Sequence, residues 1–261
     1  MTKPRNYQTE AFIIKKTKLG EADRILTLYT PHLGKIQAVA KGVRRPRSKL
    51  SGHLELLTHS QVSLARGKNL DTVIGSQTIN GYLPLKSDLG LISYALYVTE
   101  LVNQFTADHV EDKSLFDLLV ETMNRLCLCG DKEILLRYFE LHLLNEVGYR
   151  PRLEQCVSCQ SPLKNSDGYF RPSSGGILCP RCSHSRSFSY HVSVNGLEAL
   201  RLLQGNEQNT PDNLNISNNL SIELEIIMKR YIKYLLDRDV KSAAWLDSLK
   251  QQARESRLPL L

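Results

Sequence analysis

The sequence lacks an apolar run long enough to cross a lipid bilayer as a helix, which takes about 20 residues. Its most apolar stretch, residues 89–105, is interrupted by Glu100 and Asn103. The amino-terminal residues also lack the apolar segment of a secretory signal. We therefore expect a cytoplasmic protein with no membrane contact.

The sequence signatures of several enzyme classes are missing as well. There is no G-x-x-x-x-G-K phosphate loop, no H-E-x-x-H zinc motif and no G-x-S-x-G nucleophile elbow. Glu21 and Asp23 could be read as a carboxylate pair for metal-dependent cleavage, but their spacing beside Gly20 and Arg24 is more typical of a charged turn. These absences favour a binding protein over an enzyme.

What the sequence does have is an uneven distribution of charge. The whole chain carries a net charge of +7, and its first fifty residues hold twelve lysines and arginines against three acids. That segment therefore has a charge of +9, and the remaining 211 residues have a charge of −2. Such asymmetry indicates that the amino-terminal end binds a polyanion.

One run of cations in this segment contains no acid. It comprises Lys35, Lys41, Arg44, Arg45, Arg47 and Lys49. Because like charges repel at short range, the run favours a bound nucleic acid, although a solvated loop is the ordinary alternative. No recognition-helix motif adjoins the run, and small barrels bind single strands in a charged groove. We therefore predict contact with single-stranded nucleic acid.

The first eighty residues show short strands separated by turn signals about every ten residues, the pattern of a small barrel or sandwich. Five strands are predicted, at residues 11–16, 24–29, 35–40, 56–64 and 71–79. A five-stranded OB-fold barrel is the leading interpretation, with an SH3-like barrel behind it, and spacing alone does not separate the two. Four aromatic residues could stack on bases, although each is better explained as core: Tyr7, Phe12, Tyr29 and Tyr82.

Four of the six cysteines form two C-x2-C pairs with nineteen residues between them. Two tight turns can aim four thiolates at one ion, and this spacing is typical of a tetrahedral zinc site. Two redox-active C-x2-C pairs, or four unconnected thiols, are the alternatives. Four thiolate ligands leave no position for a substrate, so we predict one structural Zn²⁺ held by Cys156, Cys159, Cys179 and Cys182.

From about residue 87 the apolar period becomes that of helices. Helices are predicted to open at Ser87, Ser114 and Asn195 and to cover residues 131–147 and 221–237, with no stable structure after Trp245. The sequence thus predicts an α+β protein. Its predicted segments are a barrel at 1–82, a helical domain at 83–151, an inserted zinc module at 152–191 and the second part of the helical domain at 192–261.

Five segments carry a likeness to a known family. They are LGEADRILTLYT at residues 19–30, GKI at 34–36, AKGVRRPRS at 40–48, GGILCPRC at 175–182 and KSAAWL at 241–246. Together they resemble the bacterial recombination mediator family RecO, in the family's order and over nearly the whole chain. The resemblance implies an amino-terminal OB-fold, a helical domain and a zinc module.

The resemblance also implies a role in DNA repair. RecO-like proteins are expected to bind single-stranded and double-stranded DNA, to anneal complementary strands and, with RecR, to help load RecA onto DNA coated by single-strand-binding protein. RecR and single-strand-binding protein would be direct partners and RecA an indirect one, at the bacterial nucleoid. Positions that match the family's basic motif imply DNA contacts at Lys35, Lys41, Arg44, Arg45, Arg47 and Ser48.

An RNA-binding or ribosome-associated zinc protein is the alternative from another class, because the same charge and metal would suit it. Competition between single-stranded DNA and RNA of equal length distinguishes the two. A preference for RNA would overturn the repair assignment.

Overall fold

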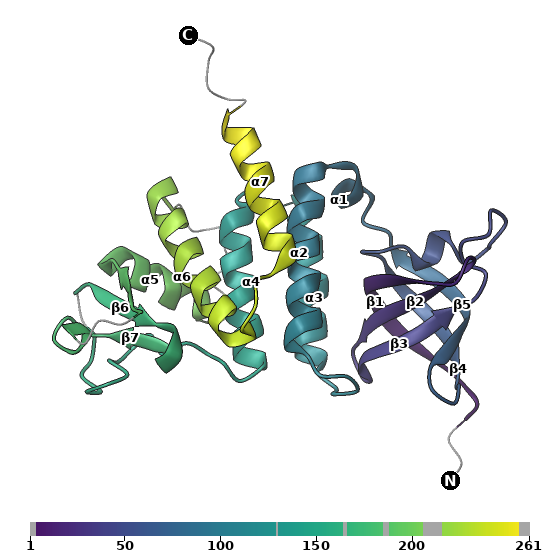
Figure 1. The fold of residues 1–261 in the computed structure, drawn as a ribbon, viewed down its shortest axis with the longest axis horizontal. Helices are drawn as coiled ribbons and strands as arrows, with labels where there is room; N and C mark the ends of the chain where they lie inside the picture. Colours follow the sequence, from purple (N-terminus) through teal and green to yellow (C-terminus); the bar gives the residue numbers. More distant parts are fainter. Residues whose placement is uncertain (1–3, 129, 164–165, 185–187, 206–215, 256–261) are drawn as a thin grey trace. The chain divides into compact units, whose positions relative to one another are not determined.

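The computed structural model describes residues 4–128, 130–163, 166–184, 188–205 and 216–255. The chain forms two compact units (Figure 1). The first comprises residues 1–127 and 241–261, and the second comprises residues 128–240. Among the described residues, no helix combines the length and the hydropathy that a membrane span requires.

Five strands of the first unit close into a barrel in the order β1-β2-β3-β5-β4 (Figure 1). They are β1 (Asn6–Leu19), β2 (Asp23–Thr30), β3 (Gly34–Ala40), β4 (His59–Ala65) and β5 (Asp71–Asn80). Neighbouring strands are antiparallel except for β3 and β5, which are parallel. The predicted five-stranded OB-fold barrel is confirmed.

The barrel closes because apolar side chains alternate along its strands. Leu26 and Leu28 on β2 and Ile36 on β3 point inward and are buried in one core with residues of β1, β4 and β5. Gly34, at the start of β3, has a φ of +61°. A Cβ there would lie 2.0 Å from the carbonyl oxygen of Val110, so the close approach of that segment requires glycine.

The rest of the first unit is helical. It contains α1 (Leu83–Ser87), α2 (Leu89–Phe105), α3 (Lys113–Leu128) and α7 (Lys241–Glu255). Helices α2 and α7 pack side by side, although they are far apart in the sequence (Figure 1). The Glu100 carboxylate on α2 accepts hydrogen bonds from the backbone amides of Lys241 and Ser242, at 3.0 and 2.7 Å, and so caps α7.

Three expectations for these helices were wrong. Asp88, and not Ser87, caps α2, since its Oδ1 accepts from the amide of Leu91 at 2.7 Å. Asp112 plays the same part at α3 instead of Ser114, with an acceptor distance of 2.9 Å. The chain after Trp245 is helical as far as residue 255, because α7 packs on α2 and buries Leu246.

The second unit combines a small sheet with helices. The sheet has the order β7-β6-β8, formed by β6 (Gly168–Arg171), β7 (Gly176–Leu178) and β8 (Tyr190–Val192). The helices are α4 (Lys132–Glu146), α5 (Val194–Gln204) and α6 (Asn218–Leu236), and α4 packs on both of the others. The α+β class predicted for the whole chain is therefore confirmed.

Candidate functional site

Four cysteine side chains of the second unit converge on one point. The Sγ atoms of Cys156, Cys159, Cys179 and Cys182 all lie within 4.8 Å of one another. The Sγ atoms of Cys159 and Cys179 are 3.8 Å apart. An ion held tetrahedrally by thiolates at about 2.3 Å separates its sulfur ligands by about 3.8 Å. The cluster therefore has the dimensions of a four-thiolate metal site.

Two tight turns build this cluster. In the first, the amide of Gln160 donates to the carbonyl of Cys156 at 2.8 Å, and Gln160 has a left-handed φ of 60°. In the second, the amide of Cys182 donates to the carbonyl of Cys179 at 3.0 Å. The amide of Val157 donates to the carbonyl of Ile177 on β7 at 2.8 Å, which brings the first turn beside the second.

The thiols of the cluster perturb one another. Burial raises the pKa of Cys156, but backbone hydrogen bonds from Cys159, Cys179 and Ser158 outweigh it and leave that pKa below its ordinary value. Hydrogen bonds from Ser161 lower the pKa of Cys159 to about 6, whereas hydrogen bonds with the Cys159 and Cys179 thiols raise the pKa of Cys182 to about 12. Four thiolates this close need a cation, so the cluster could hold a metal ion.

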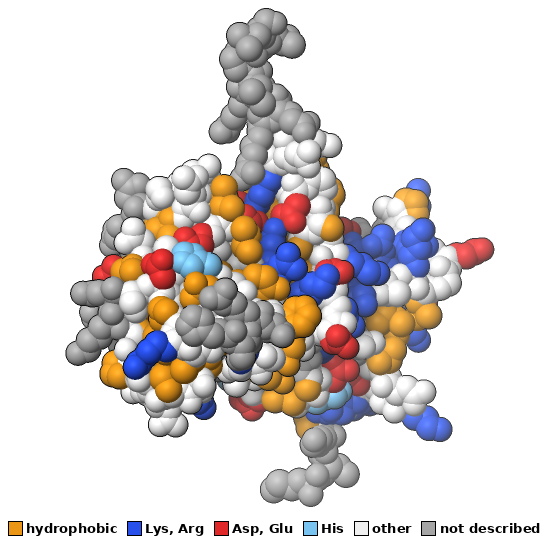
Figure 2. Space-filling model, turned by 60° about the vertical axis from the view of Figure 1, so that its left-hand side comes forward, with side chains coloured by type: hydrophobic (Ala, Val, Ile, Leu, Met, Phe, Trp, Pro, Cys, Tyr) orange, Lys and Arg blue, Asp and Glu red, His pale blue; other side chains and the backbone are white. Residues whose placement is uncertain are grey.

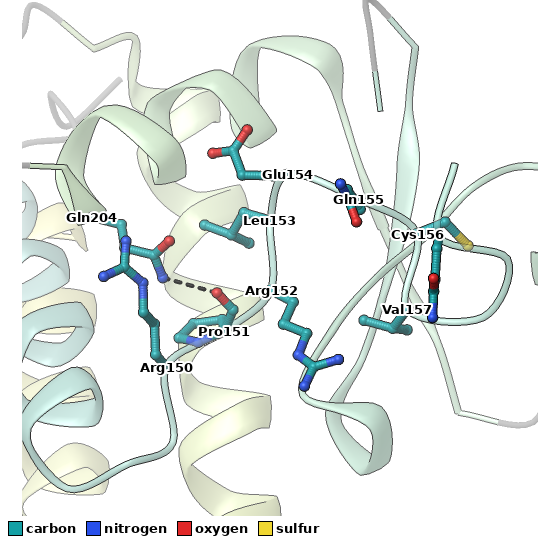
Figure 3. Close-up of a pocket in the computed structure, with 10 residues that line it drawn as sticks. Arg150, Pro151, Arg152, Leu153, Glu154, Gln155, Cys156, Val157 and Gln204 are labelled. Atoms are coloured by element: carbon teal, nitrogen blue, oxygen red, sulfur yellow. Dashed lines mark hydrogen bonds between the residues drawn. The ribbon is translucent and has the colours of Figure 1, made fainter. Parts of the chain in front are cut away.

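A pocket of about 640 Å³ adjoins the first cysteine turn (Figure 3). Its lining comprises residues 150–157, Gln160 and Gln204. Figure 3 shows the Gln204 amide directed at the carbonyl of Pro151, to which it donates at 3.0 Å. The Arg201 guanidinium donates to the carbonyls of Leu153 and Leu163, at 2.7 and 2.9 Å. These bonds tie the segment that leads into Cys156 to α5, and so position the first turn of the cysteine cluster.

The basic run of the first unit is held in place by the turn between β1 and β2. The Asp23 carboxylate accepts from the amide of Gly42 at 2.7 Å. The backbone amide of Arg44 donates to the carbonyl of Ala22 at 3.0 Å. The Arg44 guanidinium donates to the backbone carbonyl of Glu21 at 2.8 Å. Asp23 therefore anchors the loop between β3 and β4, which agrees with the charged turn expected from the spacing of Glu21 and Asp23.

Five of the six predicted DNA contacts lie in this anchored loop. Lys41, Arg44, Arg45 and Arg47 are exposed, and Ser48 is half-buried. We call residues 41–48 the cationic loop. Figure 2 shows lysine and arginine side chains gathered at the right of that view, on the face of the first unit formed by the barrel.

Lys35 lies apart from the cationic loop and has other partners. Its side chain is only 12% exposed. The ammonium donates to the carbonyls of Asn103 and Thr106, at 2.8 and 2.6 Å, and lies 3.4 Å from Asp108. A cation at these carbonyls stabilises the carboxyl end of α2. The structure therefore gives Lys35 a role in stability.

Two cations that the sequence did not single out lie beside the cationic loop. Lys18 on β1 and Arg24 on β2 are directly opposite each other, and Arg24 is in turn opposite Ala40, the residue before Lys41. Like charges paired across strands are destabilising unless an anion lies between them. The register of the β1–β2 hairpin brings Lys18 and Arg24 together, and the predicted first strand ended at residue 16, before it could pair them.

The predicted base-stacking aromatic residues have different environments. Phe12, Tyr29 and Tyr82 are buried, as expected of core residues. Tyr7 is half-buried, and its hydroxyl donates to Asp71 at 2.5 Å. Burial and the Asp71 carboxylate raise the pKa of Tyr7 above its ordinary value. All four aromatic side chains therefore make contacts within the fold.

These features define an OB-barrel protein with a cationic loop and a helical unit that carries four clustered cysteines. The family description "Recombination protein O N terminal" matches residues 1–82, and "Recombination protein O C terminal" matches residues 86–244. The chain therefore belongs to the RecO family of DNA repair proteins, and the resemblance drawn from its motifs is confirmed.

Relatives named DNA repair protein RecO align with nearly the full chain. The protein of a Dehalococcoides mccartyi strain is 45% identical over 96% of this chain and 99% of its own length. The protein of a Roseiflexus strain is 38% identical over 97% of this chain and 89% of its own length. That of Pelotomaculum thermopropionicum is 36% identical over 94% and 95%.

Proposed function

We propose that this protein is a recombination mediator that binds single-stranded DNA through the cationic loop and anneals complementary strands. The observation that carries the proposal is the anchored loop itself, where four exposed cations project beside Lys18 and Arg24. Neutralising phosphates releases their counterions and provides sequence-independent affinity for DNA. Double-stranded DNA, as the product of annealing, presents the same phosphates.

The mechanism needs no covalent chemistry. Phosphates of two strands meet the same cations in turn, which lowers the repulsion between the strands and raises their local concentration until bases pair. No bond is made or broken, so the protein acts as a binding protein and not as an enzyme. Lys35 is excluded from this step, because its ammonium is already bonded to carbonyls of the first unit.

The cysteine cluster is proposed to hold one Zn²⁺. Four thiolates are the ligands that tetrahedral zinc prefers, and four protein ligands leave no open position for water or substrate. The ion would therefore be structural. Its work in this chain is to join the turn at Cys156 to the turn at Cys179 and so to hold the β6–β7 hairpin between them.

The partners are proposed from the family and from charge. With RecR, the protein would help to load RecA onto DNA that is coated by single-strand-binding protein, so RecR and single-strand-binding protein would be its direct partners and RecA an indirect one. This work would place it in the cytoplasm at the bacterial nucleoid.

The proposal is tested by annealing of complementary oligonucleotides, measured with and without single-strand-binding protein. The variant combines Lys41→Ala, Arg45→Ala and Arg47→Ala, which leaves the Arg44 anchor intact. Its affinity for a single strand should fall about ten-fold or more. The matched control combines Lys113→Ala, Arg150→Ala and Arg238→Ala, which removes the same charge from exposed positions outside the barrel.

Equal loss of annealing in the two triple variants would show that overall charge, and not the cationic loop, binds DNA. Annealing that survives in both would refute the proposed surface. Competition between single-stranded DNA and RNA of equal length distinguishes this proposal from the RNA-binding alternative. The alternative requires that the protein bind RNA more tightly than DNA.

A further inference from the structure

The second unit contains a pocket that neither the metal cluster nor the cationic loop uses. It has a volume of about 290 Å³ and lies where α6 packs against β8 and the short 3-10 helix η2 (Pro172–Ser174). Its lining comprises Pro172, Ser173, Phe188, Tyr190, Arg230, Lys233 and Tyr234. Three aromatic rings and two cations therefore meet in one small hollow, and no carboxylate lines it among the residues that the structure describes.

Two of the three rings in this pocket are open to solvent. Phe188 is 82% exposed and Tyr234 is 52% exposed. Phe188 also has a φ of 64°, a left-handed conformation that is strained for a bulky side chain. Strained residues of this kind are concentrated at ligand-binding sites. The fold thus holds an aromatic ring outward at a cost in conformational energy, and the ring gains little burial in return.

The two cations lie one turn apart on α6 and share one face of that helix. The guanidinium carbon of Arg230 is 5.3 Å from the centre of the Tyr190 ring, within cation–π range. A guanidinium stacked on a ring keeps its N–H edge available for a phosphate. The Lys233 ammonium lies 2.7 Å from Asp239, but both side chains are more than half exposed, so that ion pair is weak.

We propose that this pocket binds one unpaired nucleotide of a single DNA strand, with the base stacked on Phe188 or Tyr190 and the phosphate bound by Arg230 and Lys233. Aromatic faces beside cations are how proteins bind single strands without reading their sequence. The inference rests on the proposed annealing function and extends it. The cationic loop binds the phosphates of each strand in turn, and the pocket gives unpaired bases a separate place to bind.

The direct test is photocross-linking of the full-length protein to an oligothymidylate that carries 5-bromodeoxyuridine. Cross-linked peptides are mapped by mass spectrometry. We expect adducts at Phe188 or Tyr190, and we expect the combined Phe188→Ala and Arg230→Gln variant to lose them. That variant should also anneal about five-fold more slowly or worse, since it lacks one stacked base and one phosphate contact.

The control is Ile226→Ala, which truncates an exposed side chain one turn before Arg230 outside the pocket lining. It should keep both the adducts and the annealing rate. Both pocket substitutions change exposed side chains, and circular dichroism establishes that the variant is folded.

Absence of adducts at the pocket, or unchanged annealing in the pocket variant, overturns this inference. If the cationic-loop variant still fails to anneal in that case, the proposed function stands without the pocket. If neither variant affects annealing, the proposed function fails as well. A pocket variant that keeps its DNA adducts but loses binding of a fluorescent acidic peptide would show that the pocket receives a protein partner, which also overturns the proposal.

Discussion

The Asp23 carboxylate accepts a hydrogen bond from the backbone amide of Gly42 at 2.7 Å, so a negative charge holds the positively charged loop in position. Gly42 has a φ of +63°, which starts the turn that follows β3. The acid lies directly before Arg24, one of the cations beside the loop. Position and charge at Asp23 therefore act in opposite directions on the binding of DNA.

Because the two effects of Asp23 oppose each other, its variants test whether DNA binding requires the cationic loop to be held in this position. Asp23→Ala removes both the charge and the acceptor, and we expect affinity for a single strand to fall by about 1 kcal/mol, roughly five-fold. Asp23→Asn removes the charge but keeps an acceptor oxygen, so its affinity should equal or exceed that of the wild type. Fluorescence anisotropy measures both. Tighter binding by the alanine variant would show that only charge matters.

The salt dependence of binding counts the phosphate contacts. Six cations surround the proposed site: Lys18, Arg24, Lys41, Arg44, Arg45 and Arg47. Each contact with single-stranded DNA contributes about −0.7 to the slope of log affinity against log salt, so the slope should be about −4. The variant without Lys41, Arg45 and Arg47 should lose about half of it. A slope near zero in the wild type would contradict the electrostatic mechanism.

A substitution at Lys35 should lower the stability of the protein without lowering its affinity for DNA. Lys35→Met keeps most of the side-chain volume but leaves the carbonyls of Asn103 and Thr106 without their donor. We expect the free energy of unfolding to fall by about 1–3 kcal/mol, measured by urea denaturation. Affinity for DNA should change less than two-fold. A large loss of affinity in a stably folded variant would return Lys35 to the DNA-binding surface.

The proposed zinc site in the cysteine cluster predicts the metal content of the protein and the part of it that unfolds first. Elemental analysis should find about one zinc ion per chain, and Cys179→Ser should reduce it. Because ion binding joins the two cysteine turns, hydrogen exchange in that variant should rise first over β6 and β7. The barrel should stay protected. A protein that contains no zinc, with all four cysteines reduced, would contradict the assignment.

Much of the barrel and the whole cysteine cluster could be predicted from local spacing. Apolar residues alternate along β2 and β3 whatever their neighbours are, and two residues between cysteines suffice for a turn that aims both thiols at one point. The helices were also found, but three caps were assigned to the wrong residue, since Asp88, Asp112 and Ser193 cap α2, α3 and α5 in place of Ser87, Ser114 and Asn195. Serine and aspartate are both good caps, and only the bonds of Asp88 to Leu91 and of Asp112 to Leu115 decide between them.

The division into segments at 1–82, 83–151, 152–191 and 192–261 stays a prediction. What the structure adds is that residues 241–261 group with the first unit, because α7 packs on α2 and Glu100 caps it. In the sequence, Glu100 gave no indication that it would cap a helix so far along the chain. Helix α7 looked unstructured in the sequence because the apolar surface that stabilises it belongs to α2, more than a hundred residues earlier.

The sequence by itself determined a five-stranded barrel, a cluster of four cysteines and the concentration of positive charge near the amino terminus, since each follows from the composition and spacing of short segments. The tertiary structure alone decided that Lys35 supports α2 while Lys41 faces solvent, and that Asp23 anchors the cationic loop. The reason is physical. The role of a cation depends on which carbonyls and charges the fold brings within a few ångströms of it.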